Sequence, residues 1–203
     1  MTIHLHQNDI PADVTFTDRV AVDTETLGLN LGRDPLCLVQ LSSGDGEAHI
    51  VQLDRNTCDA PNLKALFANP DIRKIFHFAR FDVAVIKNHL GIDCAPIYCT
   101  RTASKLVRTY TDRHGLRDNC RELLGIDLNK QMQSSDWGAA ELSKGQLSYA
   151  ANDVLYLHQL QDKLDIMLER EGRTALSRKC FEVISVQAEL DLKGWANQDL
   201  FSH

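Results

Sequence analysis

The chain lacks a long hydrophobic run, a secretory leader, low-complexity tracts and internal repeats. No stretch free of charged side chains approaches the roughly 20 residues that a membrane-spanning helix requires. The first ten residues contain neither Lys nor Arg, so we expect no signal peptide. These absences argue against membrane, collagen-like, disordered and exported proteins. They predict a globular, cytoplasmic protein with no membrane partner.

Cysteine is present at six positions but never in the CxxC spacing typical of zinc sites. The closest pair is Cys94 and Cys99, and no second pair or HxxxH motif complements it. In a cytosolic chain we expect free thiols rather than disulfides. His4 and His6 share one face of a strand, but the sequence shows no partner ligand for them. No zinc site is therefore predicted.

Basic residues are in the minority: 22 Lys and Arg face 28 Asp and Glu, for a formal net charge of −6. That balance argues against a protein that coats nucleic acid electrostatically. An enzyme that handles a few nucleotides at a time remains compatible, because residues 101–130 carry a local excess of Lys and Arg. The length of 203 residues suits one domain with a sizeable core.

Strands dominate the predicted first half of the chain, and helices dominate the second. Apolar runs bounded by turn residues predict strands at residues 19–25, 36–42, 48–53 and 72–76. Helical apolar spacing predicts helices at residues 61–68, 80–89, 100–109, 116–124, 143–168 and 174–192. This order indicates an α/β fold, with a mixed sheet flanked by helices and a helical C-terminal half.

A pair of acidic residues ends the first predicted strand. Because side chains alternate along a strand, Asp23 and Glu25 point to the same face, about 6.5 to 7 Å apart. Two carboxylates beside so apolar a run as Val20-Ala21-Val22 are costly unless a cation compensates them. By itself the pair is equally compatible with an acidic surface at a strand end.

Two further signals add acidic groups to this pair. Tyr149 and Asp153 are one helical turn apart, and Asp82 lies in the first turn of a helix that follows a strand. Each alone has an ordinary structural explanation. Together, the four carboxylates supply hard oxygen ligands suited to Mg²⁺ or Mn²⁺ rather than to zinc. Two such ions can stabilise both the attacking and the leaving oxygen of a phosphoryl displacement, so the set predicts a nuclease site.

This ordered set resembles the DEDD superfamily of 3′→5′ exonucleases, in its tyrosine-containing branch (DEDDy). The surrounding sequence is similar to ribonuclease D over roughly residues 19–168. The matching segments are VDTET at 22–26, LVQL at 38–41, FH at 76–77 with FD at 81–82, SSDW at 134–137 and YAANDVLYL at 149–157. The resemblance implies a ribonuclease H-like sheet and a phosphodiester hydrolase that releases 5′-phosphomonoesters.

Ribonuclease D continues into helical nucleic-acid-binding domains that we do not expect here. A stand-alone catalytic domain resembles the nano-RNase C type, which implies degradation of short RNA, notably dinucleotides, and a ring-shaped homo-octamer. We therefore expect one exonuclease domain over residues 1–203. Its motif-bearing core would cover about 19–168, with a C-terminal helix and tail at about 172–203.

The resemblance also implies roles for the matching residues. Asp23 would bridge two divalent cations, and Glu25 and Asp153 would complete the site of the ion that activates water. Asp82 would hold the second ion, through water, on the leaving-group side. Tyr149 would position the nucleophilic water and help it lose its proton.

Candidate substrate-binding residues surround these positions. Leu29 lies in the loop that leaves the first strand, where related exonucleases carry an apolar wedge between the last two bases; a loop leucine folded onto the core is the alternative. The remaining candidates, for sugar, base or phosphate contacts, are Thr24, His77, Phe78, Phe81, Arg101, Lys105 and Arg108, with Arg113, His114 and Arg117 as further cations. For these residues the alternative is packing in the core or, for the basic ones, a solvent-exposed helix face.

Three functions remain open on the sequence. The first is an exoribonuclease for very short single-stranded RNA. The second keeps the chemistry but acts on longer or structured RNA, or on DNA. The third is an inactive RNA-binding module, which would be expected to have lost at least one acidic ligand.

Overall fold

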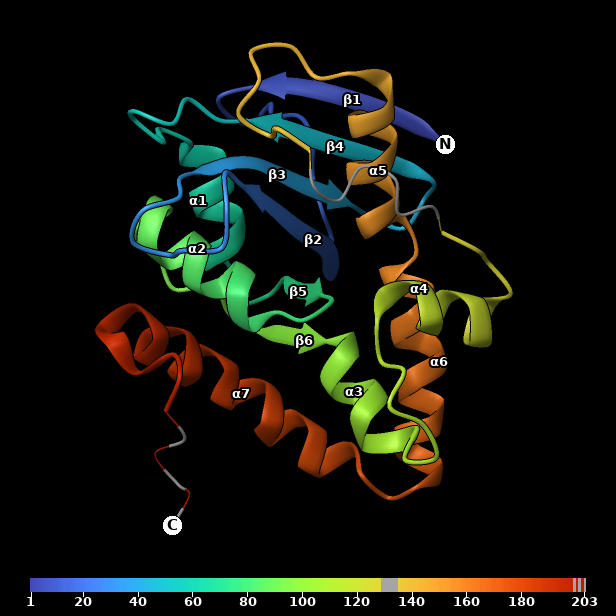
Figure 1. The fold of residues 1–203 in the computed structure, drawn as a ribbon. Helices are drawn as coiled ribbons and strands as arrows, with labels where there is room; N and C mark the ends of the chain where they lie inside the picture. The colour runs from blue at the N-terminus through green and yellow to red at the C-terminus, as the bar shows by residue number, and fades with distance from the viewer. Residues whose placement is uncertain (129–134, 199, 201, 203) are drawn as a thin grey trace.

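The computed structural model describes residues 1–128, 135–198, 200 and 202; Ser134 of the SSDW segment lies outside them. A mixed sheet with the strand order β1-β4-β3-β2-β5-β6 forms the centre of the molecule (Figure 1). β3 runs antiparallel to β2 and β4, whereas the other neighbouring strands are parallel. The strands are β1 (Thr2–Gln7), β2 (Arg19–Thr26), β3 (Leu36–Ser42), β4 (Glu47–Gln52), β5 (Arg73–Phe76) and β6 (Ile97–Cys99).

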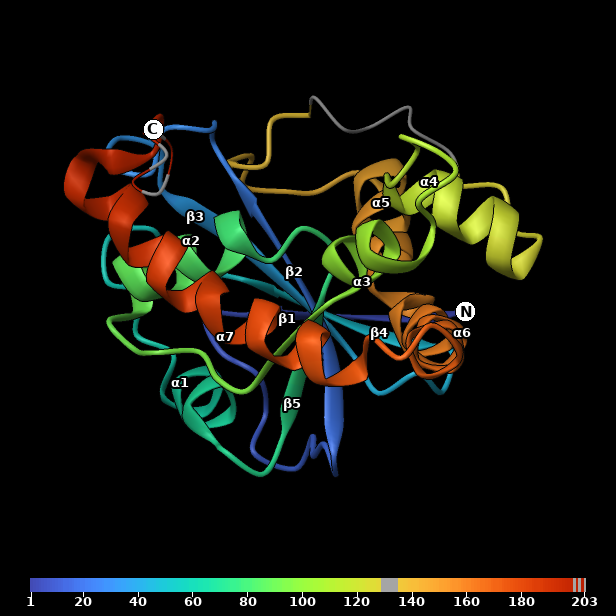
Figure 2. The same ribbon diagram turned by 90° about the horizontal axis from the view of Figure 1, so that it is seen from below.

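Helices cover both faces of this sheet. Viewed from below, α1 and α2 lie on one side of the strands and α5 and α6 on the other, while α7 passes beside the edge strand β6 (Figure 2). The helices are α1 (Pro61–Ala68), α2 (Arg80–Leu90), α3 (Thr100–Val107), α4 (Leu116–Asn119), α5 (Lys144–Leu155), α6 (Leu157–Arg170) and α7 (Thr174–Leu190), with π-helical turns at Cys120–Leu124 and Asp191–Trp195. None of the described helices is long and apolar enough to cross a lipid bilayer.

The burial of the central strands follows from these two helical layers. Every residue of β3 is buried, which explains a nearly continuous apolar sequence where a half-exposed strand would alternate. One core cluster reaches from Ile10 to Ala188 and joins strands and helices from both halves of the chain. The expected α/β class, with a mixed sheet flanked by helices, is thus confirmed.

Local signals place the helices that matter for the site. Ser143 caps α5: its hydroxyl accepts from the backbone N–H of Gln146, whose side chain accepts from the Ser143 N–H. α2 ends at Gly91, which has a left-handed φ of 70° that favours glycine. These caps mark where α5 begins and where α2 ends, the two helices that carry Asp153 and Asp82.

The single helix predicted over residues 143–168 is wrong. The chain leaves helical geometry at Tyr156 (φ −108°, ψ −1°), and α5 and α6 follow separately. The reason is tertiary, because α5 packs on β3 and β4 whereas α6 packs on α3. Apolar spacing continues through both helices, so periodicity alone does not reveal the break.

Candidate active site

The central strand β2 positions the first two carboxylates. It lies between β3 and β5, and Asp23 is opposite Gln40 while Glu25 is opposite Leu38. The register shifts between Glu25 and Thr26, where the chain leaves the sheet. Alternation along the strand puts Asp23 and Glu25 on the same face, as the sequence predicts.

The third carboxylate comes from α5, which packs across β2, β3 and β4. Asp153 approaches the strand pair so closely that one carboxylate oxygen from each of Asp23, Glu25 and Asp153 lies within 4.8 Å of the other two. Tyr149, one turn earlier on α5, forms a hydrogen bond with Asp153. The ring of Trp137 packs against that tyrosine, with 5.9 Å between the ring centroids.

The fourth carboxylate, Asp82, is buried in the first turn of α2. Its Oδ1 accepts a 2.6 Å hydrogen bond from the hydroxyl of Thr24, which lies between the two acidic residues of β2. Thr24 was a candidate for substrate contact; the structure shows that its hydroxyl orients Asp82. The link joins the strand and helix that carry three of the four acids.

The electrostatics of this cluster favour a bound cation. Burial, followed by the neighbouring carboxylates, raises the pKa of Asp23 well above its usual range and that of Glu25 to about 9. Burial raises the pKa of Asp82 and of Asp153 to about 7. No Lys, Arg or His is among the groups that shift these four pKa values. Carboxylates in this situation are stabilised in their charged form by divalent ions, and oxygen-only donors suit Mg²⁺ or Mn²⁺.

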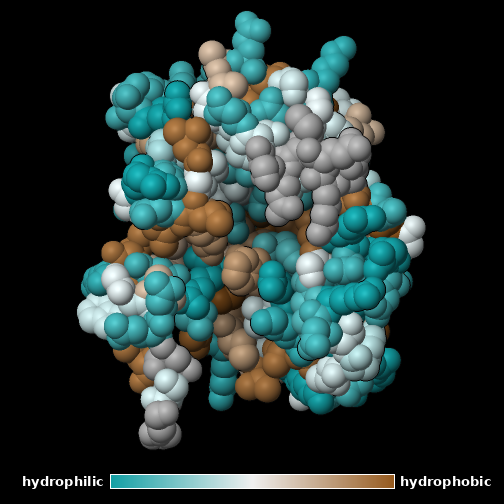
Figure 3. All heavy atoms as spheres, viewed as in Figure 1, coloured by the Kyte–Doolittle hydropathy of each residue, from teal (hydrophilic) through white to brown (hydrophobic). Residues whose placement is uncertain are grey.

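A cavity of about 970 Å³ opens over the four acids. In the space-filling view the molecule is hollowed near the middle of this face, with hydrophobic side chains beside the hollow (Figure 3). Besides the four acids and Tyr149, the lining includes these predicted substrate-binding residues: Thr24, Leu29, His77, Phe78, Phe81 and Arg101. Arg117, one of the further cations predicted to contact phosphate, also lines it, as do Leu27, Asp118, Leu128, Ser135 and Trp137.

Two apolar side chains project at this cavity. Leu29 is 85% exposed, so it does not fold back onto the core. Phe78 is half exposed and has a φ of 72°, a left-handed conformation that is costly for an aromatic residue. The guanidinium of Arg101 lies over its ring, 4.4 Å from the centroid. Both residues therefore offer apolar surface to a ligand.

His77 lines the same wall, with Nε2 of its ring buried. The hydroxyl of Thr100 donates to the carbonyl of Phe76, so its oxygen accepts from Nδ1 of His77 at 2.9 Å. This places the proton on Nδ1 and leaves a lone pair on Nε2, which has no hydrogen-bond partner within the described residues. Burial and the nearby Arg101 lower the pKa of His77 to about 3, so the ring is neutral.

The structure contradicts a phosphate contact for Arg108. Its side chain is fully buried, forms an ion pair with Glu122 and donates to Asn119 and to the carbonyl of Arg113. Lys105 is exposed on α3 but does not line the cavity. Lys105 and Arg108 follow Arg101 at helical spacing, so the sequence predicts the same role for all three. Only the packing of the folded chain distinguishes them.

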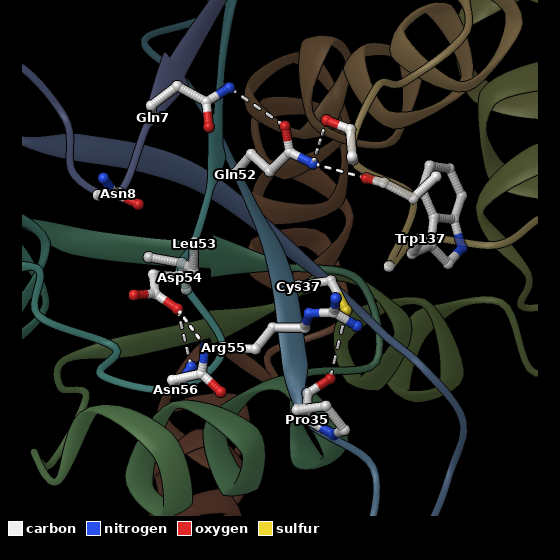
Figure 4. Close-up of a pocket in the computed structure, with 13 residues that line it drawn as sticks. Gln7, Asn8, Pro35, Cys37, Gln52, Leu53, Asp54, Arg55, Asn56 and Trp137 are labelled. Carbon is white, nitrogen blue, oxygen red and sulfur yellow. Dashed lines mark hydrogen bonds between the residues drawn. The ribbon is translucent and has the colours of Figure 1, made fainter.

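A second cavity, of about 490 Å³, adjoins the first and shares Trp137 with it (Figure 4). Gln52 accepts from Gln7 at 3.2 Å and donates to the carbonyl of Ala139 at 2.9 Å, which ties β1 and β4 to the segment after Trp137. Arg55 extends across this cavity toward Cys37. Sequence reasoning missed Trp137 and Arg55 as cavity residues; the SSDW segment marked the first, and no motif marks the second.

Comparison with known proteins agrees with this geometry. A family model described as 3′-5′ exonuclease matches residues 7–169. A ribonuclease D of Acidiphilium cryptum is 35% identical over 154 residues, which are 76% of this chain and 39% of that protein. The chain thus spans about two fifths of the length of this relative.

Solved structures similar to the whole chain include two of Brucella melitensis NrnC. The structure with bound Mg²⁺ is 52% identical, with a TM-score of 0.96 and full coverage of both chains. The structure bound to pGG is 53% identical, with a TM-score of 0.97, and the match covers 100% of this chain and 99% of that one. The ribonuclease H-like arrangement of the sheet and helices is shared with both.

Proposed function

This chain belongs to the 3′-5′ exonuclease family, and we propose that it hydrolyses short RNA, dinucleotides above all, to nucleoside 5′-monophosphates. The observation that carries the proposal is the convergence of four carboxylates and one tyrosine, from β2, α2 and α5, at the base of one cavity. The binding of pGG by Brucella NrnC supports a short substrate. All four acids are present, which disfavours an inactive binding module.

We assign Asp23 to bridge two divalent cations, since it is the acid whose pKa is raised by all three of the others. Glu25 and Asp153 would complete one ion site, and Asp82, held by Thr24, would face the other. When bound, Mg²⁺ or Mn²⁺ supplies charge stabilisation for the attacking and leaving oxygens of the phosphodiester. The donor set fits this role, and the Mg²⁺ in Brucella NrnC agrees with it.

Tyr149 would orient the attacking water through its hydroxyl. Burial and the neighbouring Asp153 raise its pKa above the usual value of a tyrosine. The hydroxyl therefore keeps its proton at neutral pH and acts as a hydrogen-bonding group. Trp137 packs against the ring and holds it in place.

The terminal nucleotides would bind along the cavity wall. Leu29 is exposed at the rim and would separate the last two bases, while Phe78 and Arg101 present a stacking surface and a positive charge. The ring of His77, which lines the same wall, would contact the terminal sugar. The 2′-hydroxyl distinguishes RNA from DNA, so such a contact would favour RNA.

We further propose that residues 1–203 form one exonuclease domain that acts in the cytoplasm as a ring-shaped homo-octamer. The shared core from Ile10 to Ala188 supports the single domain. Exposed apolar side chains along α7, namely Leu176, Val183 and Val186, support an assembly that covers them.

The test is a comparison of single-turnover rates on 5′-labelled RNAs from dinucleotide to decamer, with Mg²⁺, with Mn²⁺ and with EDTA. A preference for the dinucleotide that EDTA abolishes is the expected result. Similar rates at every length would instead establish a general exonuclease of the ribonuclease D kind, and structured RNA and DNA would be tested next. Binding without hydrolysis in either metal would overturn the enzymatic assignment.

A further inference from the structure

A cluster of three histidines and one glutamate lies on the outer strands of the sheet, apart from the four carboxylates. β1 is the edge strand and pairs in parallel with β4, so that His4 is directly opposite His49. His6 and Glu47 are each two residues away along their strands and therefore share the same face. β3 separates β4 from the strand that carries Asp23.

The side chains of this cluster already contact one another. Nε2 of His4 lies 2.9 Å from a carboxylate oxygen of Glu47, and Nε2 of His6 lies 3.0 Å from Nδ1 of His49. The rings of His4 and His49 are stacked with centroids 4.8 Å apart. One ligand atom from each of His4, Glu47 and His49 lies within 4.8 Å of the other two.

We propose that His4, His49 and Glu47 bind a transition-metal ion of the Zn²⁺ class, with water as the fourth ligand. Two imidazoles and one carboxylate form a donor set that zinc accepts and that Mg²⁺ does not favour. Tetrahedral bonds of about 2.0–2.2 Å require ligand atoms about 3.4 Å apart. Because the rings of His4 and His49 are stacked, both must turn toward a shared ion; His4 and Glu47 are 38% and 46% exposed, which leaves their side chains room to move.

His6 would support the site without binding the ion. Its hydrogen bond engages Nδ1 of His49, which leaves Nε2 of that ring for the ion. Such outer partners fix the orientation and protonation of a metal-bound imidazole.

An ion at this position would join β1 to β4. β1 pairs only with β4 among the described strands, so the ion would hold an edge strand in place (Figure 1). The expected consequence is a gain in stability upon zinc binding, which follows from binding to the folded state alone. Catalysis at the carboxylates does not enter this inference.

The experiment is a zinc titration of tag-free, EDTA-stripped, full-length protein in excess Mg²⁺, by calorimetry and by competition with a chromophoric chelator. The wild type is compared with His49→Ala, with Glu47→Gln and with the control His89→Ala, a histidine on α2 outside the cluster. Mg²⁺ and the four carboxylates of the candidate active site are common to all four proteins, so differences in zinc binding report the cluster on β1 and β4.

We expect the wild type and His89→Ala to bind one more equivalent of zinc than His49→Ala, and to gain thermal stability from it. Glu47→Gln keeps the shape of a partly exposed side chain and should bind at least tenfold more weakly. Cobalt in place of zinc should give the visible absorption of a tetrahedral site in the wild type and in His89→Ala, and should not give it in His49→Ala. Equal zinc stoichiometry and affinity in all four proteins, or no zinc binding by the wild type, would overturn the proposal.

Discussion

The hydroxyl of Thr24 on β2 donates a 2.6 Å hydrogen bond to Oδ1 of Asp82 on α2. This bond lowers the pKa of Asp82, against the larger effect of burial, which raises it. It therefore favours the ionised form that a metal requires. The strand and the helix are thus linked by a side chain that is not itself acidic.

We expect Thr24→Val to lower activity and to move the acid limb of the pH–rate profile to higher pH. Without the hydroxyl the pKa of Asp82 rises further, so the carboxylate stays protonated over a wider range. A hydrogen bond to a charged group contributes about 1.5–3 kcal/mol, which corresponds to at least a tenfold loss. Thr24→Ser, which keeps the hydroxyl, should retain the wild-type profile. An unshifted limb in Thr24→Val would contradict the role.

Asp23→Asn should abolish hydrolysis and yet stabilise the metal-free protein at neutral pH. Raised pKa values mean that the folded protein binds more protons than the unfolded chain, so stability falls as pH rises from about 4 toward 7. Removing one carboxylate relieves this cost by on the order of 1 kcal/mol, or about 2–4 °C in Tm. Thermal melts in EDTA and in Mg²⁺ measure it.

Mg²⁺ should raise the Tm of the wild type more at pH 8 than at pH 6, since the carboxylates are more fully ionised at the higher pH. Asp23→Asn should lose most of this increase. A variant that remained active, or that melted earlier than the wild type in EDTA, would be incompatible with the arrangement of ligands.

Tyr149→Phe should retain metal binding and lose turnover. The change removes only the hydroxyl that would orient water, and its volume is almost unchanged. A loss of about 100-fold or more in the single-turnover rate is expected for a group that acts on proton transfer. Mg²⁺ affinity from calorimetry serves as the control. Unchanged hydrolysis would show that another group positions the nucleophile.

Arg101 and Arg108 form a matched pair, seven residues apart along the chain. Arg101→Ala should raise KM with little effect on Tm, because Arg101 lines the cavity beside Phe78. Arg108→Ala should lower Tm, through a loss of about 1–3 kcal/mol in the free energy of unfolding, because it leaves the buried side chain of Asn119 without its hydrogen-bond donor. The opposite pattern in KM and Tm would reverse the assignment.

Sedimentation of the pure protein should reveal an assembly far larger than one 22.8 kDa chain. Val183→Asp places a charge among the exposed apolar residues of α7 and should dissociate it while leaving the fold intact, as circular dichroism would report. A wild type that sediments as a monomer would remove the ring from the proposal.

The sequence by itself determined the kinds of chemistry available to this protein. Alternation along β2 put Asp23 and Glu25 on one face, and helical spacing put Tyr149 one turn from Asp153, because both patterns depend only on local backbone geometry. Four strands and the α/β class followed from apolar runs for the same reason, whereas the edge strands β1 and β6 were not among the predicted strands. Motif resemblance then identified which distant acids belong together.

Only the tertiary structure decided what meets across the chain. The parallel register of β1 and β4 puts His49 and Glu47 beside His4, which by sequence had no partner ligand. The interruption at Tyr156, and the burial of Arg108 while Arg101 faces the cavity, also depend on which surfaces pack together. Such contacts are set by pairing between segments far apart in sequence, and no local pattern encodes them.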